Sequence, residues 1–354
     1  MAAPGGRAAK GALSCPCPIG YERPWNRTYP VEHFAMTSLV TIFGGSGFVG
    51  RHTVRAFAKA GWRIRVAVRH PNLANYLLPM GNVGQIAIVK TDATDAEQVA
   101  RAVAGSDAVV NLVGILWQSG HQSFEAVHAE AAENIAKAAK AAGAKTLVHV
   151  SAIGADEESE AKYAKSKADG EARIRAAFPD AAILRPSVVF GPEDSFLNKF
   201  ASLAAMLPFL PLIGGGHTRF QPAFVGDVAA AILKCAGDET TRGKIYELGG
   251  PETISFKALM QFLLKQTCRK KLLIPVPFGL ASLKAVFLGL LPNPILTLDQ
   301  VRMLKTDNVV QDGMPGFADL GITPDSLEAI APSYLWRFRP KGQFEAVADE
   351  AAKA

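Results

Sequence analysis

The 354-residue chain has few cysteines and no long uninterrupted apolar run. Its four cysteines are Cys15, Cys17, Cys235 and Cys268. The spacing of the first two does not match a common zinc clip and no histidine pair accompanies them, so no metal site is expected. Sparse cysteines also suit a reducing compartment. No stretch reaches the roughly 18 uncharged apolar residues that a transmembrane helix needs, so no membrane span is expected.

The chain also lacks a basic tract with interleaved aromatic residues, although its net charge is +6. A nucleic-acid partner is therefore not expected. Charged residues make up 20% of the chain and apolar residues 49%, which is typical of a globular protein and not of a disordered one. A mildly basic globular protein suits a nucleotide ligand, an acidic partner or an anionic membrane face.

An apolar strand and a glycine-rich turn occupy residues 39–50, LVTIFGGSGFVG. Gly44 lets the chain turn sharply, Gly47 lets the backbone approach phosphate oxygens, and Gly50 lets the next helix pack against the strand. The first gap between glycines is one residue longer than in the usual dinucleotide fingerprint. An ordinary turn is the alternative, but the position between a strand and a helix expected at 51–60 indicates a pyrophosphate site.

A second pattern follows the strand expected at 146–150. Tyr163 and Lys167 are four residues apart and share one helix face, where an ammonium group can lower the pKa of a phenol. Ser151, at the end of the strand, can hydrogen-bond the same substrate oxygen. These three residues form a candidate catalytic site for carbonyl or alcohol chemistry. The alternative is an amphipathic helix with a surface Tyr and Lys.

Strands are expected at 39–43, 64–68, 86–90, 108–113, 146–150, 182–184 and 244–248, with helices at 51–60, 96–104 and 124–142 and around Tyr163. This alternation predicts an α/β fold, a doubly wound parallel sheet with a smaller C-terminal lobe. Residues 1–35 are expected to be a disordered leader or a mis-assigned start. The Rossmann core is expected at 36–190, completed by about 220–250. The lobe is expected at 191–219 and 251–340, and a flexible tail at 341–354.

Five further segments accompany these patterns: RPSVVFGPED at 185–194, GGGHTRFQP at 214–222, VGDVA at 225–229, PVPFG at 275–279 and LDQVR at 298–302. With them the chain resembles the short-chain dehydrogenase/reductase superfamily in its extended or atypical branch. Within that branch, it is similar from about residue 36 to 344 to the dinucleotide-binding accessory subunits of respiratory complex I and their bacterial counterparts. Sugar-nucleotide epimerases and dehydratases share most of these motifs.

The cofactor is expected to be NADP(H), with NAD(H) less favoured. No acidic residue follows the second strand to bind a free ribose hydroxyl, and Arg69 can pair with a 2′-phosphate there. A solvated surface cation is the alternative for Arg69. The pyrophosphate site is expected to comprise Gly44, Ser46, Gly47, Phe48, Val49 and Gly50.

The resemblance implies further cofactor contacts. It implies Asp92 near the adenine, Val113 and Gly114 behind the adenosine ribose, and Tyr163 with Lys167 on the nicotinamide ribose. A turn residue before the following helix is the alternative for Asp92.

Three other polar residues are expected to be structural. His128 is expected to be packed or solvent-facing, His149 to be a core residue with a satisfied nitrogen, and Asp227 to cap a helix. The gap from Ser151 to Tyr163 is shorter than in many epimerase-like relatives, so the catalytic placement of Ser151 stays open.

One stretch bears on the choice between two functions. Arg269, Lys270 and Lys271 precede an apolar segment at 272–298, in which prolines bracket a helix expected at 278–291. Such a helix is about 21 Å long, too short to span a bilayer. It suits a partner groove or a peripheral membrane contact, or else the core of the lobe.

The first hypothesis is a structural NADP(H)-binding subunit that docks on complex I subunits. It would lie on the cytoplasmic face of a bacterial inner membrane or the matrix face of a mitochondrial one. The second is an NADP-dependent reductase, or a sugar-nucleotide epimerase or dehydratase. In that enzyme Tyr163 would be the acid/base, Lys167 its electrostatic partner and Ser151 the oxygen holder.

Overall fold

The computed structural model describes residues 38–120, 122–289, 294 and 296–344. The leader expected at 1–35 and most of the expected tail lie outside these residues. The chain from Thr37 onward forms one compact unit. None of the helices in the described ranges is both long enough and apolar enough to cross a bilayer.

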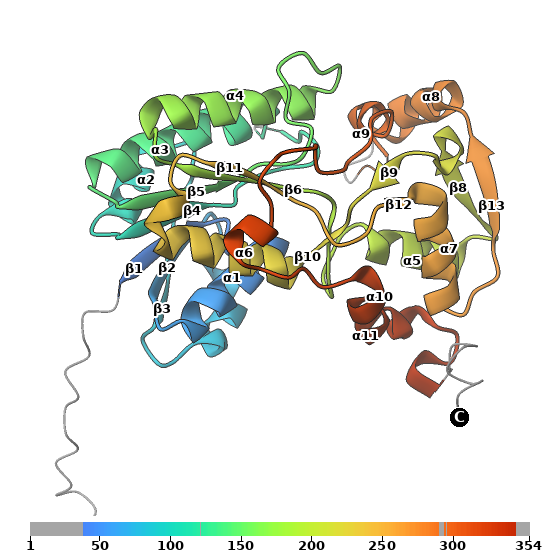
Figure 1. Cartoon of the computed structure of the whole chain (residues 1–354), viewed down its shortest axis with the longest axis horizontal. Helices are drawn as coiled ribbons and strands as arrows, with labels where there is room; N and C mark the ends of the chain where they lie inside the picture. Colours follow the sequence, from blue (N-terminus) through green and yellow to red (C-terminus); the bar gives the residue numbers. More distant parts are fainter. Residues whose placement is uncertain (1–37, 121, 290–293, 295, 345–354) are drawn as a thin grey trace, which may run out of the picture. The chain divides into compact units, whose positions relative to one another are not determined.

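A seven-stranded parallel sheet in the order β11-β6-β5-β4-β1-β2-β3 forms the centre of the fold (Figure 1). Its strands are β1 (Leu39–Phe43), β2 (Arg63–Val68), β3 (Ile86–Lys90), β4 (Ala108–Asn111), β5 (Thr146–Val150), β6 (Ala182–Pro186) and β11 (Ile245–Leu248). The chain builds outward from β1 through β2 to β3 and then returns to β4 on the other side of β1. This order is that of a doubly wound Rossmann sheet, which confirms the predicted fold class.

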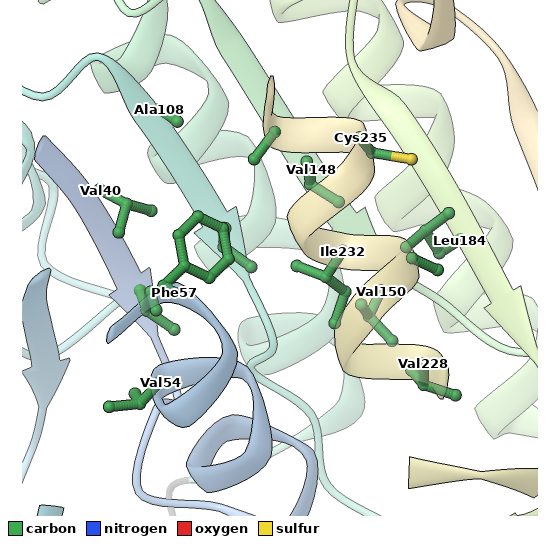
Figure 2. Packing of buried hydrophobic residues seen from close by; sticks show 14 of the residues in the cluster. Val40, Val54, Phe57, Ala108, Val148, Val150, Leu184, Val228, Ile232 and Cys235 are labelled. Atoms are coloured by element: carbon green, nitrogen blue, oxygen red, sulfur yellow. The ribbon is translucent and has the colours of Figure 1, made fainter. Parts of the chain in front are cut away.

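Helices cover both faces of the sheet (Figure 1). One face carries α1 (Phe48–Lys59) and α6 (Val225–Gly237), and the other carries α2 (Ala96–Val103), α3 (Ala131–Ala141) and α4 (Lys162–Ala177). Figure 2 shows the first of these layers, where Phe57 of α1 and Ile232 of α6 lie against Val40, Val148 and Val150 of the strands. All five side chains are buried, so the sheet and its helices form one apolar core.

Most of the remaining elements build a second core beside the sheet. It gathers buried residues such as Leu197, Leu259 and Leu335 around a group of phenylalanines that includes Phe220 and Phe256. The remaining elements are β7 (Val189–Phe190), α5 (Leu197–Met206), β8 (Phe209–Ile213), β9 (Arg219–Phe220), β10 (Ala223–Phe224), β12 (Ile254–Ser255), α7 (Phe256–Gln266), β13 (Leu272–Val276), α8 (Phe278–Leu288), α9 (Leu298–Met303), α10 (Leu327–Ile330) and α11 (Pro332–Leu335). Of these, α8 and α9 share a small separate cluster.

Several local expectations differ from the structure. The helix expected at 124–142 is a π-helical turn, η3 (Glu125–Glu130), followed by α3. A 3-10 segment, η2 (Pro71–Met80), connects β2 to β3 and was not expected. The helix expected at 278–291 ends at Leu288, and residues 290 and 291 lie outside the described ranges.

Asp227 does not cap its own helix. It lies in the first turn of α6, and its Oδ2 accepts the backbone N–H of Asp325 at 2.7 Å. The expected cap is therefore wrong, because the carboxylate ties a later segment of the chain to α6.

Candidate dinucleotide site

The glycine turn follows β1 at its carboxyl end. The neighbouring strand β4 ends beside it, at the point where the strand order of the sheet reverses. The N–H of Leu112, just after β4, donates to the carbonyl oxygen of Phe43 at 3.0 Å, so the ends of the two strands meet here. Gly44 has φ +75°, and a Cβ there would lie 3.0 Å from the Leu112 backbone. A reversal point at the carboxyl ends of the strands is where open α/β sheets bind their ligands.

The other two glycines have different surroundings. A Cβ on Gly50 would lie 2.6 Å from the Cα of Gly45, so this glycine permits α1 to pack directly on the turn. Gly47 is exposed, and only the carbonyl oxygen of Gly44 would lie within 4 Å of a Cβ there, at 3.3 Å. Because Gly47 has no side chain, there is an open space over its backbone, which we call the cradle, and a phosphate group can approach the backbone there.

The start of α1 suits an anion. Its N-cap residue is Gly47, no side chain caps it, and its first turn contains no acidic residue. The first-turn N–H groups and the positive end of the helix dipole are therefore available to a pyrophosphate. The half-buried Ser46, Phe48 and Val49 complete this turn, as the sequence predicts. Together with the cradle at Gly47, these residues fit a bound dinucleotide.

A second arginine lies beside the glycine turn, in addition to the one expected to bind a 2′-phosphate. Arg69 is exposed directly after β2. Arg51 follows the third glycine, and its guanidinium lies 5.0 Å from the ring centroid of Tyr76 on η2. The Tyr76 hydroxyl donates to the carbonyl oxygen of Ser46 at 2.6 Å and so ties η2 to the glycine turn. Sequence reasoning missed Arg51, and its signal is a basic residue directly after the glycine motif.

Asp92 lies two residues beyond β3 and organises a turn. Its Oδ1 accepts both the backbone N–H of Thr94 at 3.0 Å and the Thr94 hydroxyl at 2.8 Å. These bonds match the alternative of a turn residue before α2, whose own cap is Asp95. The adenine contact of Asp92 stays a prediction.

The loop after β4 approaches the helix that carries the tyrosine and lysine. Val113 is half-buried, and its N–H donates to the Asn111 side chain at 3.0 Å. A Cβ on Gly114 would lie 3.4 Å from the Nζ of Lys167. The structure thus brings Gly114 and Lys167 together, although they lie far apart in the sequence.

Tyr163 and Lys167 lie in the first half of α4, with the Lys167 Nζ 6.0 Å from the ring centroid of Tyr163. Lys167 is buried and donates to the carbonyl oxygen of Val150 at 3.3 Å. Burial lowers the pKa of Lys167 to about 8, partly opposed by the charge of Glu171. Burial also raises the pKa of Tyr163 to about 12. The expected lowering of the phenol pKa is not found, because desolvation dominates.

His149 on β5 and Ser151 directly after it have buried polar atoms that form no hydrogen bond with the described residues. Ser151 follows β5 directly, as expected, and its buried Oγ has no hydrogen-bond partner among the described residues. His149 shares the sheet face of Leu147, beneath α3 and α4, and neither ring nitrogen has a partner in the described part of the chain. Burial holds its pKa well below the usual value. The expected satisfied nitrogen of His149 is therefore wrong, whereas its core position is confirmed.

His128 is packed and links two parts of the site. Its Nε2 accepts the N–H of Ile115 at 3.0 Å, so its Nδ1 carries the proton and donates to the Oγ of Ser166 at 2.8 Å. Ser166 in turn donates to the carbonyl oxygen of Tyr163 at 2.8 Å. Burial lowers the pKa of His128 to about 3, which keeps the ring neutral. This histidine holds the loop after β4 against α4.

These features define a class of protein: a Rossmann protein with a candidate dinucleotide site at the reversal point of its sheet. In agreement, the NAD(P)H-binding family model matches residues 44–195. In the part of the chain that the structure describes, no cluster of three or more His, Cys, Asp or Glu side chains could hold a metal ion.

Comparisons narrow the class. The chain is 34% identical over 316 residues to NADH dehydrogenase (ubiquinone) 1 alpha subcomplex subunit 9, mitochondrial, of Arabidopsis thaliana, covering 86% of this chain and 79% of that protein. It is also 34% identical over 195 residues to a ceramide reductase of Caulobacter vibrioides, covering 55% and 60% of the two chains. The chain belongs to the family of the alpha subcomplex subunit 9 proteins.

A solved structure shares the fold. The NADPH-dependent quinone oxidoreductase of Escherichia coli, solved with NADPH, matches with a TM-score of 0.66 and 21% identity over 84% of this chain and 99% of its own. This similarity supports the Rossmann fold.

Proposed function

We propose that this protein is an NADP(H)-binding, non-catalytic accessory subunit of respiratory complex I that stabilises or assembles the complex at the membrane face. The support is family membership across most of the chain, because the relatives are named as subunits of NADH dehydrogenase (ubiquinone). The protein would lie peripherally, on the matrix face of a mitochondrial inner membrane or the cytoplasmic face of a bacterial one.

The chain's own residues would hold the cofactor at both ends. The turn from Gly44 to Gly50 would bind the pyrophosphate through backbone N–H groups, and Arg69 and Arg51 would pair with the 2′-phosphate. Tyr163 and Lys167 would hold the nicotinamide ribose. The lack of an acidic side chain directly after β2 favours NADP(H) over NAD(H). When bound, the nicotinamide supplies the capacity for hydride transfer.

The choice of a holding role over catalysis rests on the relatives, which are named as complex I subunits. Burial raises the pKa of Tyr163 to about 12, so its phenol is neutral in the cofactor-free protein. Lys167 gives a hydrogen bond to the Val150 carbonyl. A neutral phenol and a buried ammonium are good hydrogen-bond donors to ribose hydroxyls.

The alternative is an NADP-dependent reductase or a sugar-nucleotide enzyme that uses Tyr163 and Lys167. The match to a ceramide reductase favours the reductase form of this alternative. A sugar diphosphate needs cations, and two candidates have close carboxylate partners, whereas the partner of Arg51, Glu193, is 3.9 Å away. Arg185 forms a close pair with the buried Glu171, with its Nη2 2.6 Å from Oε2, and Arg219 pairs with Asp307 at 2.8 Å.

An apolar docking surface supports the accessory role. On α8 only Ala281 and Ala285 are buried, so the alternative of a helix inside the core is wrong. We define the docking surface by its exposed apolar side chains: Leu272, Ile274, Leu280, Leu283, Val286 and Phe287. Lys270 and Lys284 are exposed beside it. Apolar side chains flanked by lysines match the interface of an anionic membrane, which we propose as the contact of residues 272–298.

Three variants in native membranes test the proposal. Phe287 is 67% exposed, so Phe287→Asp should fold and retain cofactor but detach from complex I and the membrane. The matched control is Leu73→Asp on η2, a 75% exposed apolar residue outside the docking surface, which should remain attached. Tyr163→Phe should leave assembly and electron transfer intact. A folded Phe287→Asp protein that stays attached would refute the docking surface.

The same variants address the enzyme alternative. Purified protein is assayed for NADPH-dependent reduction of ceramide-like ketones and for conversion of sugar nucleotides. Turnover that Tyr163→Phe abolishes would overturn the structural-subunit proposal.

A further inference from the structure

The helix that carries Tyr163 and Lys167 has no cap of its own. The N-cap residue of α4 is Ala161, which offers no side-chain hydrogen bond, and the first turn of α4 contains no acidic residue. By contrast, Ser255 caps α7 and Thr297 caps α9. A helix start without a cap leaves several N–H groups without an intrahelical partner.

A carboxylate from a distant segment fills this role. Asp299 Oδ1 accepts the N–H of Lys162 at 2.7 Å, and Oδ2 accepts the N–H of Tyr163 at 2.9 Å. Asp299 lies on α9, 136 residues further along the chain than Tyr163. Both bonds are charge-assisted, and the carboxylate lies at the positive end of the α4 dipole.

The backbone of Tyr163 is consequently held at both polar atoms. Its N–H is bound by Asp299, and its carbonyl oxygen accepts the Ser166 hydroxyl, which His128 supports from the opposite side. The side chain can still rotate, but its starting point is fixed. This arrangement fixes the backbone that carries the Tyr163 phenol, the proposed hydrogen-bond donor to the nicotinamide ribose.

Asp299 is itself held in place. Its helix α9 begins with a capping box, in which the Thr297 hydroxyl accepts the Gln300 N–H and the Gln300 side chain accepts the Thr297 N–H. Val301 is fully buried in the small apolar cluster that α9 shares with α8. At the end of this segment, Lys305 pairs with Glu160 at 3.1 Å, directly before α4. In Figure 1, α9 lies between the start of α4 and α8.

We propose that Asp299 is a positioning residue of the cofactor site: by clamping the first turn of α4 it sets the position of Tyr163 and so raises the affinity for NADP(H). The inference rests on the proposed function, in which Tyr163 holds the nicotinamide ribose. It adds to that function a contribution from the lobe, because α9 lies outside the sheet and the glycine turn.

The experiment measures NADPH affinity by calorimetry on the full-length protein, with urea unfolding of the cofactor-free protein alongside. Asp299→Asn keeps one acceptor oxygen and loses the other together with the charge. The matched control is Asp307→Asn, because Asp307 also accepts a distant backbone N–H, that of Arg219 at 2.7 Å, away from α4. Both variants are made in the wild-type and Tyr163→Phe backgrounds.

Asp299→Asn is expected to weaken NADPH binding about fivefold, the size of one lost hydrogen bond, and Asp307→Asn less than twofold. In the Tyr163→Phe background the effect of Asp299→Asn should shrink to less than about twofold, because the donor that it positions is gone. A merely structural cap would lower stability in both backgrounds and leave NADPH affinity unchanged.

Unchanged affinity in Asp299→Asn, or the same loss in both backgrounds, would overturn the proposal. The Tyr163→Phe single variant separates this failure from that of the proposed function. If Tyr163→Phe alone leaves affinity unchanged, Tyr163 does not hold the cofactor, and its proposed ribose role fails together with the positioning role. If it weakens binding and Asp299→Asn does not, only the positioning role fails.

Discussion

Gly50→Ala should lower the stability of the fold, whereas Gly47→Ala should lower the affinity for NADPH, so the two variants separate helix packing from phosphate binding. At Gly50 the new Cβ would lie 2.6 Å from the Cα of Gly45, whereas ordinary contacts begin at 3.4 Å. The Gly44 carbonyl oxygen would lie closer still, and these neighbours are backbone atoms that cannot rotate away, so α1 must shift. Overpacking of this kind costs up to about 3 kcal/mol, and the better helix propensity of alanine returns about 1 kcal/mol. The expected loss of stability is about 2 kcal/mol.

At Gly47 the same substitution should do little to folding. The residue has φ −75° and ψ −176°, which any residue adopts, and its Cβ would have a single neighbour at 3.3 Å. Replacing a glycine N-cap by alanine costs about 1 kcal/mol or less. The methyl group would, however, occupy the cradle that the pyrophosphate approaches. NADPH affinity should fall more than about tenfold, equivalent to 1.4 kcal/mol.

Urea unfolding of the cofactor-free proteins measures the first effect, and calorimetry with NADPH measures the second. NADPH at 100 times its Kd should stabilise the wild type by about 2.7 kcal/mol, and Gly47→Ala should lose at least about half of this gain at the same concentration. Unchanged NADPH affinity in Gly47→Ala would refute the pyrophosphate assignment. Wild-type stability of Gly50→Ala would refute the packing argument.

Three further predictions concern polar side chains. Arg69→Asp should weaken NADP(H) binding by about 1.5–3 kcal/mol and favour NAD(H), and unchanged calorimetry with both would place Arg69 outside the site. Burial raises the pKa of Asp227 to about 6, above its unfolded value near 3.9, so its carboxylate destabilises the fold increasingly between pH 4 and 6. Asp227→Asn should therefore add about 1–2 kcal/mol in urea unfolding at pH 7.5 and nothing at pH 4, and an equal gain at both would contradict this. His128→Asn, too short to bridge Ile115 and Ser166, should cost about 1–3 kcal/mol, and an unchanged melting temperature would contradict the bridge.

The sequence pattern predicted the sheet well because it reflects local physics. Apolar β-branched runs alternate with helical periods, and this alternation calls for parallel strands joined by right-handed crossovers. The glycine motif predicted the turn for the same reason, since each glycine answers a local steric demand. Even the late strand β11 was recognisable from its own residues.

Features that depend on distant contacts could not be predicted. The π-helical turn at His128 faces Gly170, where any Cβ would collide with the His128 carbonyl oxygen, and nothing near His128 in the sequence signals this. The pKa of Tyr163 depends on burial, which outweighs the lysine that the motif brings near it. The Asp299 clamp joins residues 136 positions apart, and only the folded chain brings them together.

The position of α9 links the Tyr163 and Lys167 pair to the proposed docking surface. One side of α9 clamps the start of α4 through Asp299, and the other packs on α8 through Val301. Helix α8, which carries part of the docking surface, is thus connected to Tyr163 through two contacts of α9: the packing of Val301 and the hydrogen bond of Asp299. Under the two proposals, a shift of α9 on docking that displaces Asp299 changes NADP(H) affinity, and by reciprocity NADP(H) changes docking by the same free energy. We therefore expect NADPH to strengthen attachment of the wild type and to have no such effect on Asp299→Asn, and an equal effect on both would contradict this coupling.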